Sequence, residues 1–155
     1  MKKGFSLIEL MVAVTIISIM VSIGVSAYGR GKERQSGKAA GDIIMTFLSD
    51  NQKKANIGKR DCIGKYMGQK VTFSAPNILQ AQSLCSTSNQ NPLPSPTVIP
   101  DITGLSNTSV TFKPLSAGID LGASTSLDIT YTSVASKVYT VRINNTGTFE
   151  YLGTP

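Results

Sequence analysis

The chain has 155 residues and a formal net charge of +6, with 15 Lys and Arg against 9 Asp and Glu. It contains no His and only two Cys, so the commonest general base and the commonest metal ligand are both missing. Without His and with only two Cys, the chain cannot form a Cys and His zinc site, a Ser-His-Asp triad or a Cys-His pair. We therefore expect a protein that is not an enzyme, that uses no cofactor or metal, and that is long enough for one domain plus an anchor.

The N-terminal part of the chain is apolar over the length of a membrane span. Nineteen residues from Leu10 to Tyr28 carry no charge. At about 1.5 Å per residue, a helix of this length crosses a hydrocarbon core about 30 Å thick. We expect one spanning helix. Because Val25-Ser26-Ala27 fits the cleavage site of a secretory signal peptide, ordinary secretion stays an alternative at this point.

One carboxylate, Glu9, lies at the start of the apolar segment. A charged side chain in a membrane helix costs about 2.5 to 3.5 kcal/mol on insertion scales, and less near the interface. One interpretation places Glu9 at the level of the lipid headgroups. In the other, the acid meets a cation at its own depth. Since the helix contains no Lys or Arg, that cation would come from another chain or from a new amino terminus.

The stretch GFSLIEL at residues 4–10, behind a short Lys-Lys leader, resembles the N-terminal signature of type IV prepilins and pseudopilins. In that family a membrane aspartic peptidase, the prepilin peptidase, removes a leader that ends in Gly. The resemblance implies that residues 1–4 are the leader, that the bond between Gly4 and Phe5 is cut, and that Phe5 becomes N-methylated. It also implies that Glu9 neutralises the terminal amine of a neighbouring subunit during assembly.

The resemblance implies partners and a location as well. The partners are other pilin or pseudopilin subunits, prepilin peptidase, membrane lipid, and an inner-membrane assembly platform with its ATPase, since the chain has no GxxxxGK[ST] motif of its own. Before assembly the chain is expected to span the membrane once with its bulk outside the cytoplasm. After assembly it belongs to a periplasmic or extracellular filament.

The residues after the spanning segment keep a helical period. From about residue 33 to residue 56, the positions that recur every three or four residues hold mostly apolar side chains. These positions are Ala40, Ile44, Phe47, Leu48, Asn51 and Ala55. We expect residues 5–29 to form the transmembrane or filament-core helix, residues 30–56 to continue it as an amphipathic helix, and Gly58 to stop it.

The spanning helix departs from the family pattern at one position. Many type IV pilins have a proline where this chain has Ser26, so the usual proline kink is not expected. Interior glycines each lower helix stability by about 1 kcal/mol relative to Ala. The stretch from Gly24 to Gly31 is therefore where we expect the helix to bend or melt locally in the filament.

Residues 57–155 are expected to form a β-rich head. Runs rich in Val, Ile, Thr, Tyr and Phe predict strands at 70–75, 78–85, 109–113, 127–132, 137–143 and 148–152. Turn residues between neighbouring runs indicate antiparallel hairpins. Residues 89–100 contain four prolines and predict a loop. The expected fold class is α+β and pilin-like, with a long N-terminal helix packed on an antiparallel sheet or β-sandwich.

The end of the head is similar to a particular subgroup. The strand order and the closing stretch KVYTVRINNTGTFEY at residues 137–151 resemble the H-type minor pseudopilins of type II secretion and the FimT-like minor pilins. The resemblance to this subgroup rests on less specific features than the leader does. Another pilin subtype is the alternative.

Cys62 and Cys85 are the only cysteines and are twenty-three residues apart. The part of the chain that contains them is expected to face an oxidising compartment, which favours a disulfide. Such a bond would stabilise the fold by about 3 kcal/mol in the chain-entropy model. The alternative is a pair of buried free thiols.

Basic side chains gather after the amphipathic helix, and two interpretations stay open. The residues are Lys53, Lys54, Lys59, Arg60, Lys65 and Lys70. One interpretation is a solvated surface. The other is a phosphate-contacting patch in a DNA-binding minor pilin, with a steep dependence on salt. Only Tyr66 supplies an aromatic ring within this run, so base stacking gives the second interpretation little support.

The leading functional hypothesis is a structural subunit of a type IV filament system that serves a pilus or type II secretion. The first alternative is the DNA-binding minor pilin. The second is an unrelated membrane-anchored or secreted β-domain protein.

Overall fold

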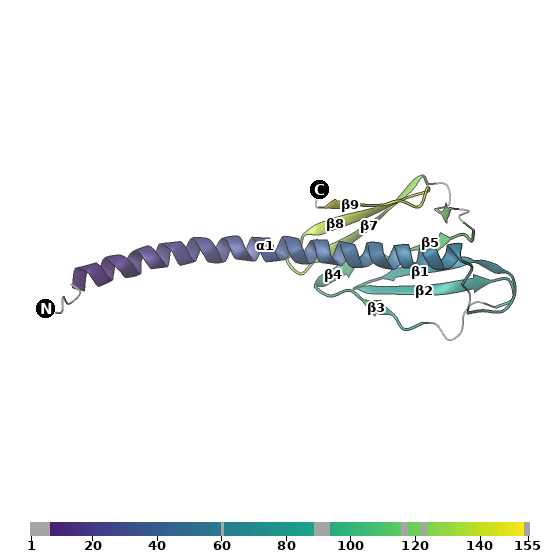
Figure 1. Cartoon of the computed structure of the whole chain (residues 1–155), viewed down its shortest axis with the longest axis horizontal. Coiled ribbons are helices and arrows are strands. Elements are labelled where there is room, and N and C mark those ends of the chain that lie inside the picture. Colours follow the sequence, from purple (N-terminus) through teal and green to yellow (C-terminus); the bar gives the residue numbers. More distant parts are fainter. Residues whose placement is uncertain (1–6, 60, 89–93, 116–117, 122–123, 154–155) are drawn as a thin grey trace. The chain divides into compact units, whose positions relative to one another are not determined.

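The computed structural model describes residues 7–59, 61–88, 94–115, 118–121 and 124–153. An N-terminal helix precedes a series of mostly short strands (Figure 1). In chain order the elements are α1 (Leu7–Asn56), β1 (Tyr66–Ser74), β2 (Ile78–Cys85), β3 (Thr97–Val98), β4 (Ile102–Leu105), β5 (Thr108–Phe112), β6 (Ile119–Asp120), β7 (Ser126–Ser133), β8 (Val138–Asn144) and β9 (Phe149–Gly153). This is the α+β architecture that the sequence predicts.

The chain divides into two compact units, Met1–Gln35 and Ser36–Pro155. In the first unit, the described residues belong to α1 alone. The second unit contains the remaining part of α1 and both sheets. The helix α1 continues without a break through Gly24, Gly29 and Gly31. The expectation that this stretch bends or melts concerns the assembled filament, so it stays a prediction.

The strands form two antiparallel sheets. The five-stranded sheet has the order β3-β2-β1-β5-β6, and the four-stranded sheet has the order β4-β7-β8-β9. The hairpins β1–β2 and β7–β8–β9 pair strands that are consecutive in sequence. Between them the chain passes from the first sheet to β4, back to β5 and β6, and then to β7. Each sheet is therefore completed by strands from separate parts of the chain.

One face of α1 and the inner faces of both sheets share a single hydrophobic core in the second unit. On α1 the buried apolar positions step by four or seven residues, as expected for one stripe of a helix. They are Ala40, Ile44, Leu48 and Ala55. Val71 and Phe73 of β1 and Ile129 and Val141 of the four-stranded sheet lie in the same cluster. The predicted amphipathic helix is thus held by packing against both sheets.

The C-terminus of α1 is closed by a Schellman motif. The backbone N–H of Lys59 donates to the carbonyl of Lys54 at 3.0 Å, and the N–H of Gly58 donates to the carbonyl of Ala55 at 3.2 Å. Gly58 has a φ of 67°, a left-handed conformation that glycine adopts without steric cost. The structure therefore confirms Gly58 as the stop signal.

Three tyrosines of the four-stranded sheet pack on a pair of helix glycines. The rings of Tyr131 and Tyr139 stack with centroids 5.4 Å apart, and those of Tyr139 and Tyr151 lie 6.4 Å apart. The hydroxyl of Tyr131 donates a hydrogen bond to the carbonyl of Gly37 at 2.7 Å. A Cβ at Gly41 would lie 2.8 Å from the Tyr131 hydroxyl oxygen and 2.9 Å from the Tyr151 ring. Because these glycines have no side chains, the tyrosine rings can pack directly against the helix.

The six predicted strands are present, and β2 has the predicted limits. The other five differ at their ends, most of all β1, which begins at Tyr66 rather than at Lys70. The structure adds β3, β4 and β6, which the sequence did not predict. Because β3 pairs with Ile78 and Leu79 of β2, part of the expected loop at residues 89–100 is strand and that prediction is wrong there. Residues 89–93 lie outside the described part.

The predicted disulfide is confirmed. Cys62 and Cys85 are bonded, with Cα atoms 6.0 Å apart. Cys62 lies in the segment between α1 and β1, and Cys85 is the last residue of β2. The bond therefore fastens the segment that leaves the helix to the first hairpin of the head.

Candidate functional site

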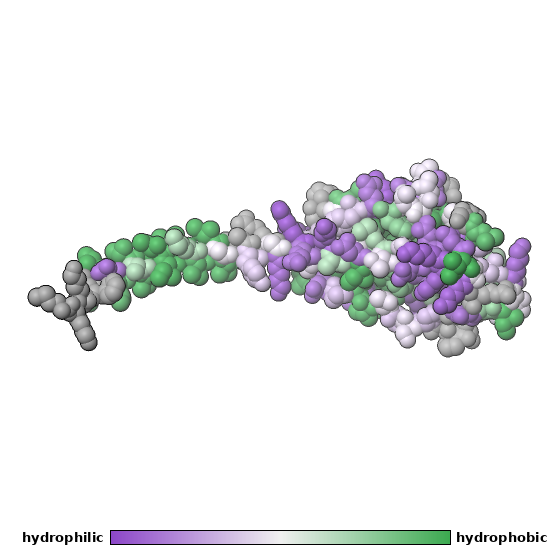
Figure 2. Space-filling model, in the orientation of Figure 1, coloured by the Kyte–Doolittle hydropathy of each residue, from purple (hydrophilic) through white to green (hydrophobic). Residues whose placement is uncertain are grey.

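The first part of α1 presents an apolar surface suited to a membrane. Residues Leu7–Val25 form a stretch of 19 residues with a mean hydropathy of 2.4, and none of it is buried. Figure 2 shows this apolar surface along the helix before the more polar surface that follows. By length and composition the segment can cross a bilayer. A single N-terminal apolar helix fits a membrane-anchored precursor.

The hydroxyl side chains within the apolar segment bond to the helix itself. The hydroxyls of Thr15, Ser18 and Ser22 donate to the carbonyls of Val12, Val14 and Ile19, each at 2.8 Å. A buried hydroxyl without a partner is costly in hydrocarbon. Because each of these hydroxyls already has an acceptor one turn away, the segment can enter lipid or a helix bundle without leaving a hydroxyl donor unsatisfied.

Glu9 lies in the first turn of α1 and is exposed. A carboxylate at this end of a helix is favoured by the unpaired N–H groups and the helix dipole. Among the described residues, Glu9 forms no ion pair. Gly4 and Phe5, the predicted cleavage and methylation residues, lie outside the described part of the chain. The predicted contact between Glu9 and a new amino terminus therefore stays a prediction.

The structure separates the basic residues into two groups. Lys53 and Lys54 belong to the last turn of α1, and Lys59 follows its cap. Lys65 precedes β1, and these four side chains are exposed. Arg60 lies outside the described residues.

Lys70 lies on a different surface from the helix lysines. Its neighbours in sequence, Gln69 and Val71, are buried, and Gln69 bonds to Asn51 of α1. Because side chains alternate along a strand, Lys70 projects from the face of the five-stranded sheet that is turned away from α1. The predicted patch is thus not one continuous surface.

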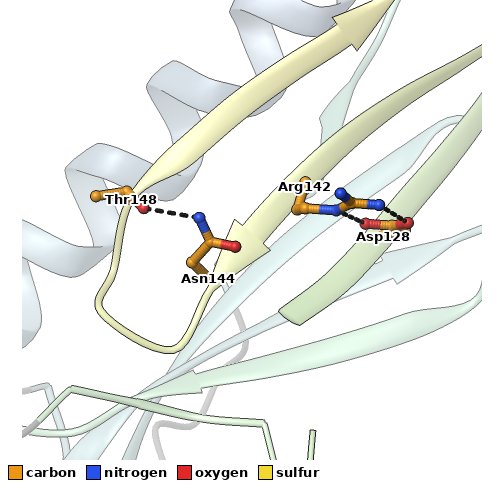
Figure 3. Close-up of polar contacts among 4 residues, drawn as sticks. All are labelled: Asp128, Arg142, Asn144 and Thr148. Atoms are coloured by element: carbon orange, nitrogen blue, oxygen red, sulfur yellow. Dashed lines mark hydrogen bonds and ion pairs between the residues drawn. The ribbon is translucent and has the colours of Figure 1, made fainter. Parts of the chain in front are cut away.

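The C-terminal hairpin is fixed by polar contacts on its outer face (Figure 3). Arg142 of β8 donates to both carboxylate oxygens of Asp128 of β7, at 2.7 and 2.8 Å. This contact lowers the pKa of Asp128 and raises that of Arg142. Across the turn that follows, the amide of Asn144 donates to the Thr148 hydroxyl at 3.1 Å. Asp128 and Arg142 are directly opposite each other in the β7–β8 ladder, so the ion pair agrees with the register of these strands.

The turn of the same hairpin is joined to the helix. The side-chain amide of Gln52 donates to the carbonyl of Gly147 at 3.2 Å. Gly147 has a φ of 86° and lies so close to Gln52 that a Cβ there would overlap the amide. The β8–β9 hairpin is thus tied to α1 at its tip.

The sequence did not indicate a buried polar relay between α1 and the five-stranded sheet. Asn51 of α1, Gln69 of β1 and Ser83 of β2 are 1%, 5% and 2% exposed. Gln69 donates to the Asn51 side-chain oxygen at 3.3 Å and accepts from the Ser83 hydroxyl at 3.0 Å. The one available signal was Asn51, a polar residue at a position in the helical period that is otherwise apolar.

A long N-terminal helix, apolar at its start and packed further along on antiparallel sheets, defines an α+β fold of the pilin-like kind. Residues 1–25 match the model of the prokaryotic N-terminal methylation motif, which is typical of type IV prepilins and pseudopilins. The motif supports a precursor of the type IV pilin or pseudopilin kind and implies processing by prepilin peptidase and assembly with other pilins. No curated protein and no solved structure matches the chain.

Proposed function

We propose that this protein is a structural subunit of a type IV filament, made as a prepilin, cut between Gly4 and Phe5, methylated at Phe5, and assembled through its N-terminal helix. The observation that carries the proposal is the methylation motif at residues 1–25. The fully exposed apolar segment Leu7–Val25 supports it, because such a surface requires lipid or the apolar helices of other subunits around it. The proposed organisation is a leader at 1–4, a core helix at 5–29, an amphipathic continuation at 30–56 and a head at 57–155.

The role that we assign to Glu9 follows from electrostatics. A carboxylate in an apolar environment is unfavourable unless a cation neutralises it. Cleavage after Gly4 creates an ammonium group four residues from Glu9, and in a neighbouring subunit that group can reach the depth of the acid. Because charges interact more strongly where the dielectric constant is low, this contact can set the axial register between subunits.

The partners and the location follow from the same proposal. Other pilin or pseudopilin subunits surround the helix, and an inner-membrane platform with its ATPase supplies the energy of assembly. The head lies outside the cytoplasm, in agreement with the Cys62–Cys85 disulfide, since such bonds persist in oxidising compartments. We place the chain with the H-type minor pseudopilins and FimT-like minor pilins on the strength of its closing hairpin, β8 and β9.

The experiment that tests this function is the incorporation of a Glu9→Ala variant into filaments. The variant should insert into the membrane and lose its leader normally, because neither step uses the carboxylate. Its amount in sheared filaments should fall at least about tenfold, since an unpaired ammonium then lies in the apolar core. The amount of Glu9→Asp in filaments should fall less, because this variant keeps the charge. Thr15→Val is the control for a substitution in the same helix that leaves the carboxylate in place. Normal incorporation of Glu9→Ala would contradict the assigned role.

DNA uptake by a basic surface is the second candidate function. Four exposed lysines favour it, namely Lys53, Lys54, Lys59 and Lys65, whereas the position of Lys70 on another face counts against a six-residue patch. A DNA-binding surface would retain DNA at low salt and release it steeply as salt rises. Absence of retention by the full chain at low salt would exclude this function.

A further inference from the structure

A polar cavity of about 320 Å³ lies beside the C-terminal end of α1, next to β1 and β2. The buried side chains of Asn51, Gln69 and Ser83 line its inner part. The exposed side chains of Lys54 and Lys59 line it nearer to the solvent. Its volume is at the lower end of the range of about 300 to 1,000 Å³ that is typical of ligand pockets, which suits a small molecule or a single functional group.

The orientation of the two buried amides follows from their hydrogen bonds. Asn51 Nδ2 donates at 2.7 Å to the backbone carbonyl of Phe47, which can only accept. Asn51 Oδ1 is therefore the atom that accepts from Gln69 Nε2, and Gln69 Oε1 is the atom that accepts from the Ser83 hydroxyl. Within the described residues each amide nitrogen thus uses one of its two N–H groups. The second N–H of each amide has no acceptor among the described residues, and both side chains line the cavity.

The charged side chains that line the cavity also favour a ligand that accepts hydrogen bonds. Lys54 and Lys59 are held together because the backbone N–H of Lys59 donates to the carbonyl of Lys54 at 3.0 Å. Asp61 supplies the one negative charge among the lining residues, so the formal charge of the lining is positive. Amide N–H groups and ammonium groups are all hydrogen-bond donors. The site therefore favours a ligand that accepts hydrogen bonds and carries negative charge.

Covalent and hydrogen bonds fix both sides of the cavity. On one side the Cys62–Cys85 disulfide holds the residue after Asp61 to the end of β2. On the other, Gln80 of β2 donates from its side-chain amide to the carbonyl of Pro94 at 3.2 Å. The buried amides of Asn51 and Gln69 are held by their own hydrogen bonds, so these two donors are positioned before a ligand arrives, which reduces the entropy lost on binding.

We propose that this cavity binds an oxyanion, either the carboxylate or the phosphate group of a small molecule. The amide N–H groups of Asn51 and Gln69 would bind its oxygens from within, and the ammonium groups of Lys54 and Lys59 would neutralise its charge. The proposal is independent of filament assembly, since none of these residues belongs to the N-terminal segment of the helix.

The test is a titration of the isotope-labelled full chain in detergent with sodium phosphate and, separately, with sodium acetate, at constant ionic strength. The side-chain amide resonances of Asn51 and Gln69 should shift and reach saturation with at least one of these anions. Glycerol, a neutral molecule, should leave them unchanged. A response to one anion alone supports the proposal and identifies the type of oxyanion that the site prefers. Absence of a saturable shift with both anions overturns it.

Matched lysine variants separate a built site from general attraction to a basic protein. Lys54→Ala and Lys59→Ala should each raise the Kd about fivefold, the upper end expected for an exposed charge contact. Lys53→Ala and Lys65→Ala remove exposed lysines that do not line the cavity. These controls should leave the Kd unchanged. Equal weakening by the controls would overturn the proposal in favour of non-specific charge attraction.

Discussion

Gly37 and Gly41 of α1 allow the four-stranded sheet to pack closely on the helix, because glycine has no side chain. Glycine lowers the stability of a helix interior by about 1 kcal/mol relative to Ala. Here the space above each glycine is occupied by tyrosine side chains of the four-stranded sheet, Tyr139 at Gly37 and Tyr131 with Tyr151 at Gly41. The loss of helix propensity is therefore offset by packing that no larger residue would allow.

Gly41→Ala should destabilise the head by about 1 to 3 kcal/mol, the usual effect of overpacking a filled core, although alanine favours the helix itself. Urea unfolding of the full chain in detergent, followed by tyrosine circular dichroism, measures the difference. Gly31→Ala is the matched control, because no described atom outside the local helix lies within 4 Å of a Cβ placed there. It should be neutral or slightly stabilising. Equal effects of the two substitutions would contradict the packing role of Gly41.

The buried hydroxyl of Tyr131 makes the stability of the fold depend on pH in the alkaline range. Burial is the main cause that raises the pKa of Tyr131, and Tyr151 and Tyr139 beside it act in the same direction. The folded chain therefore keeps its proton above the ordinary tyrosine pKa of about 10, at which the unfolded chain releases it. By linkage, this contribution to stability is fully present below pH ~10 and falls as the pH rises further.

Tyr131→Phe should lose about 1 kcal/mol of stability at pH 7, because the hydrogen bond to the Gly37 carbonyl is lost. Above pH ~10 its stability should fall less steeply than that of the unchanged protein, since one raised pKa has been removed. A residual slope from Tyr151, whose pKa burial also raises, is expected. Identical alkaline slopes of urea stability for the two proteins would exclude Tyr131 as the titrating group.

At the scale of elements, α1 depends on different partners along its length. Its first part, from Leu7 to Val25, is predominantly apolar, and none of it is buried. Its last part is fixed by the core, by the Schellman motif at Gly58 and by the Asn51–Gln69 and Gln52–Gly147 hydrogen bonds. The Cys62–Cys85 disulfide then fastens the chain immediately beyond the helix. Within the second unit, the part of α1 that starts at Ser36 is therefore held in the head.

Replacing both cysteines, Cys62→Ser with Cys85→Ser, should lower the free energy of unfolding by about 3 kcal/mol, as the chain-entropy model gives for a loop of this length. Urea unfolding measures the loss, and reduction of the unchanged protein with dithiothreitol should produce a loss of similar size. The double variant should not respond to dithiothreitol. Should the reduced and oxidised proteins unfold at the same urea concentration, the disulfide would have no stabilising role.

At the scale of the whole molecule, features coded by nearby residues could be predicted from sequence. The apolar run and the helical period predicted the helix, Gly58 predicted its C-terminal end, and the turn residues between consecutive runs predicted the hairpins β1–β2 and β8–β9. By contrast, β3, β4 and β6 contain two to four residues each and are completed by pairing with other strands. Their local composition carries little signal because partners from elsewhere in the chain create them.

The same distinction applies to the candidate sites. The motif around Glu9 is contiguous and could be read directly, as could the two cysteines, since no other pairing within the chain exists. The relay of Asn51, Gln69 and Ser83 could not, because its members come from α1, β1 and β2 and meet only in the folded head. The separation of Lys70 from the helix lysines likewise depends on which face of β1 is turned inward.

Processing at Gly4 is the step on which the proposed function rests. A bulky substitution such as Gly4→Trp should block leader removal, because the peptidase acts next to this residue, and Gly4→Ala should be tolerated better. Gel mobility of the chain in cells that contain prepilin peptidase distinguishes precursor from mature protein. Unimpeded maturation of the Trp variant would contradict the cleavage assignment.

The most direct test of the account is mass spectrometry of the mature amino terminus, on protein made in cells with a type IV filament system. The proposed processing predicts a chain that begins at Phe5, carries an N-methyl group and lacks residues 1–4. A chain that begins near Tyr28 would indicate ordinary secretion after signal-peptide cleavage and would contradict it.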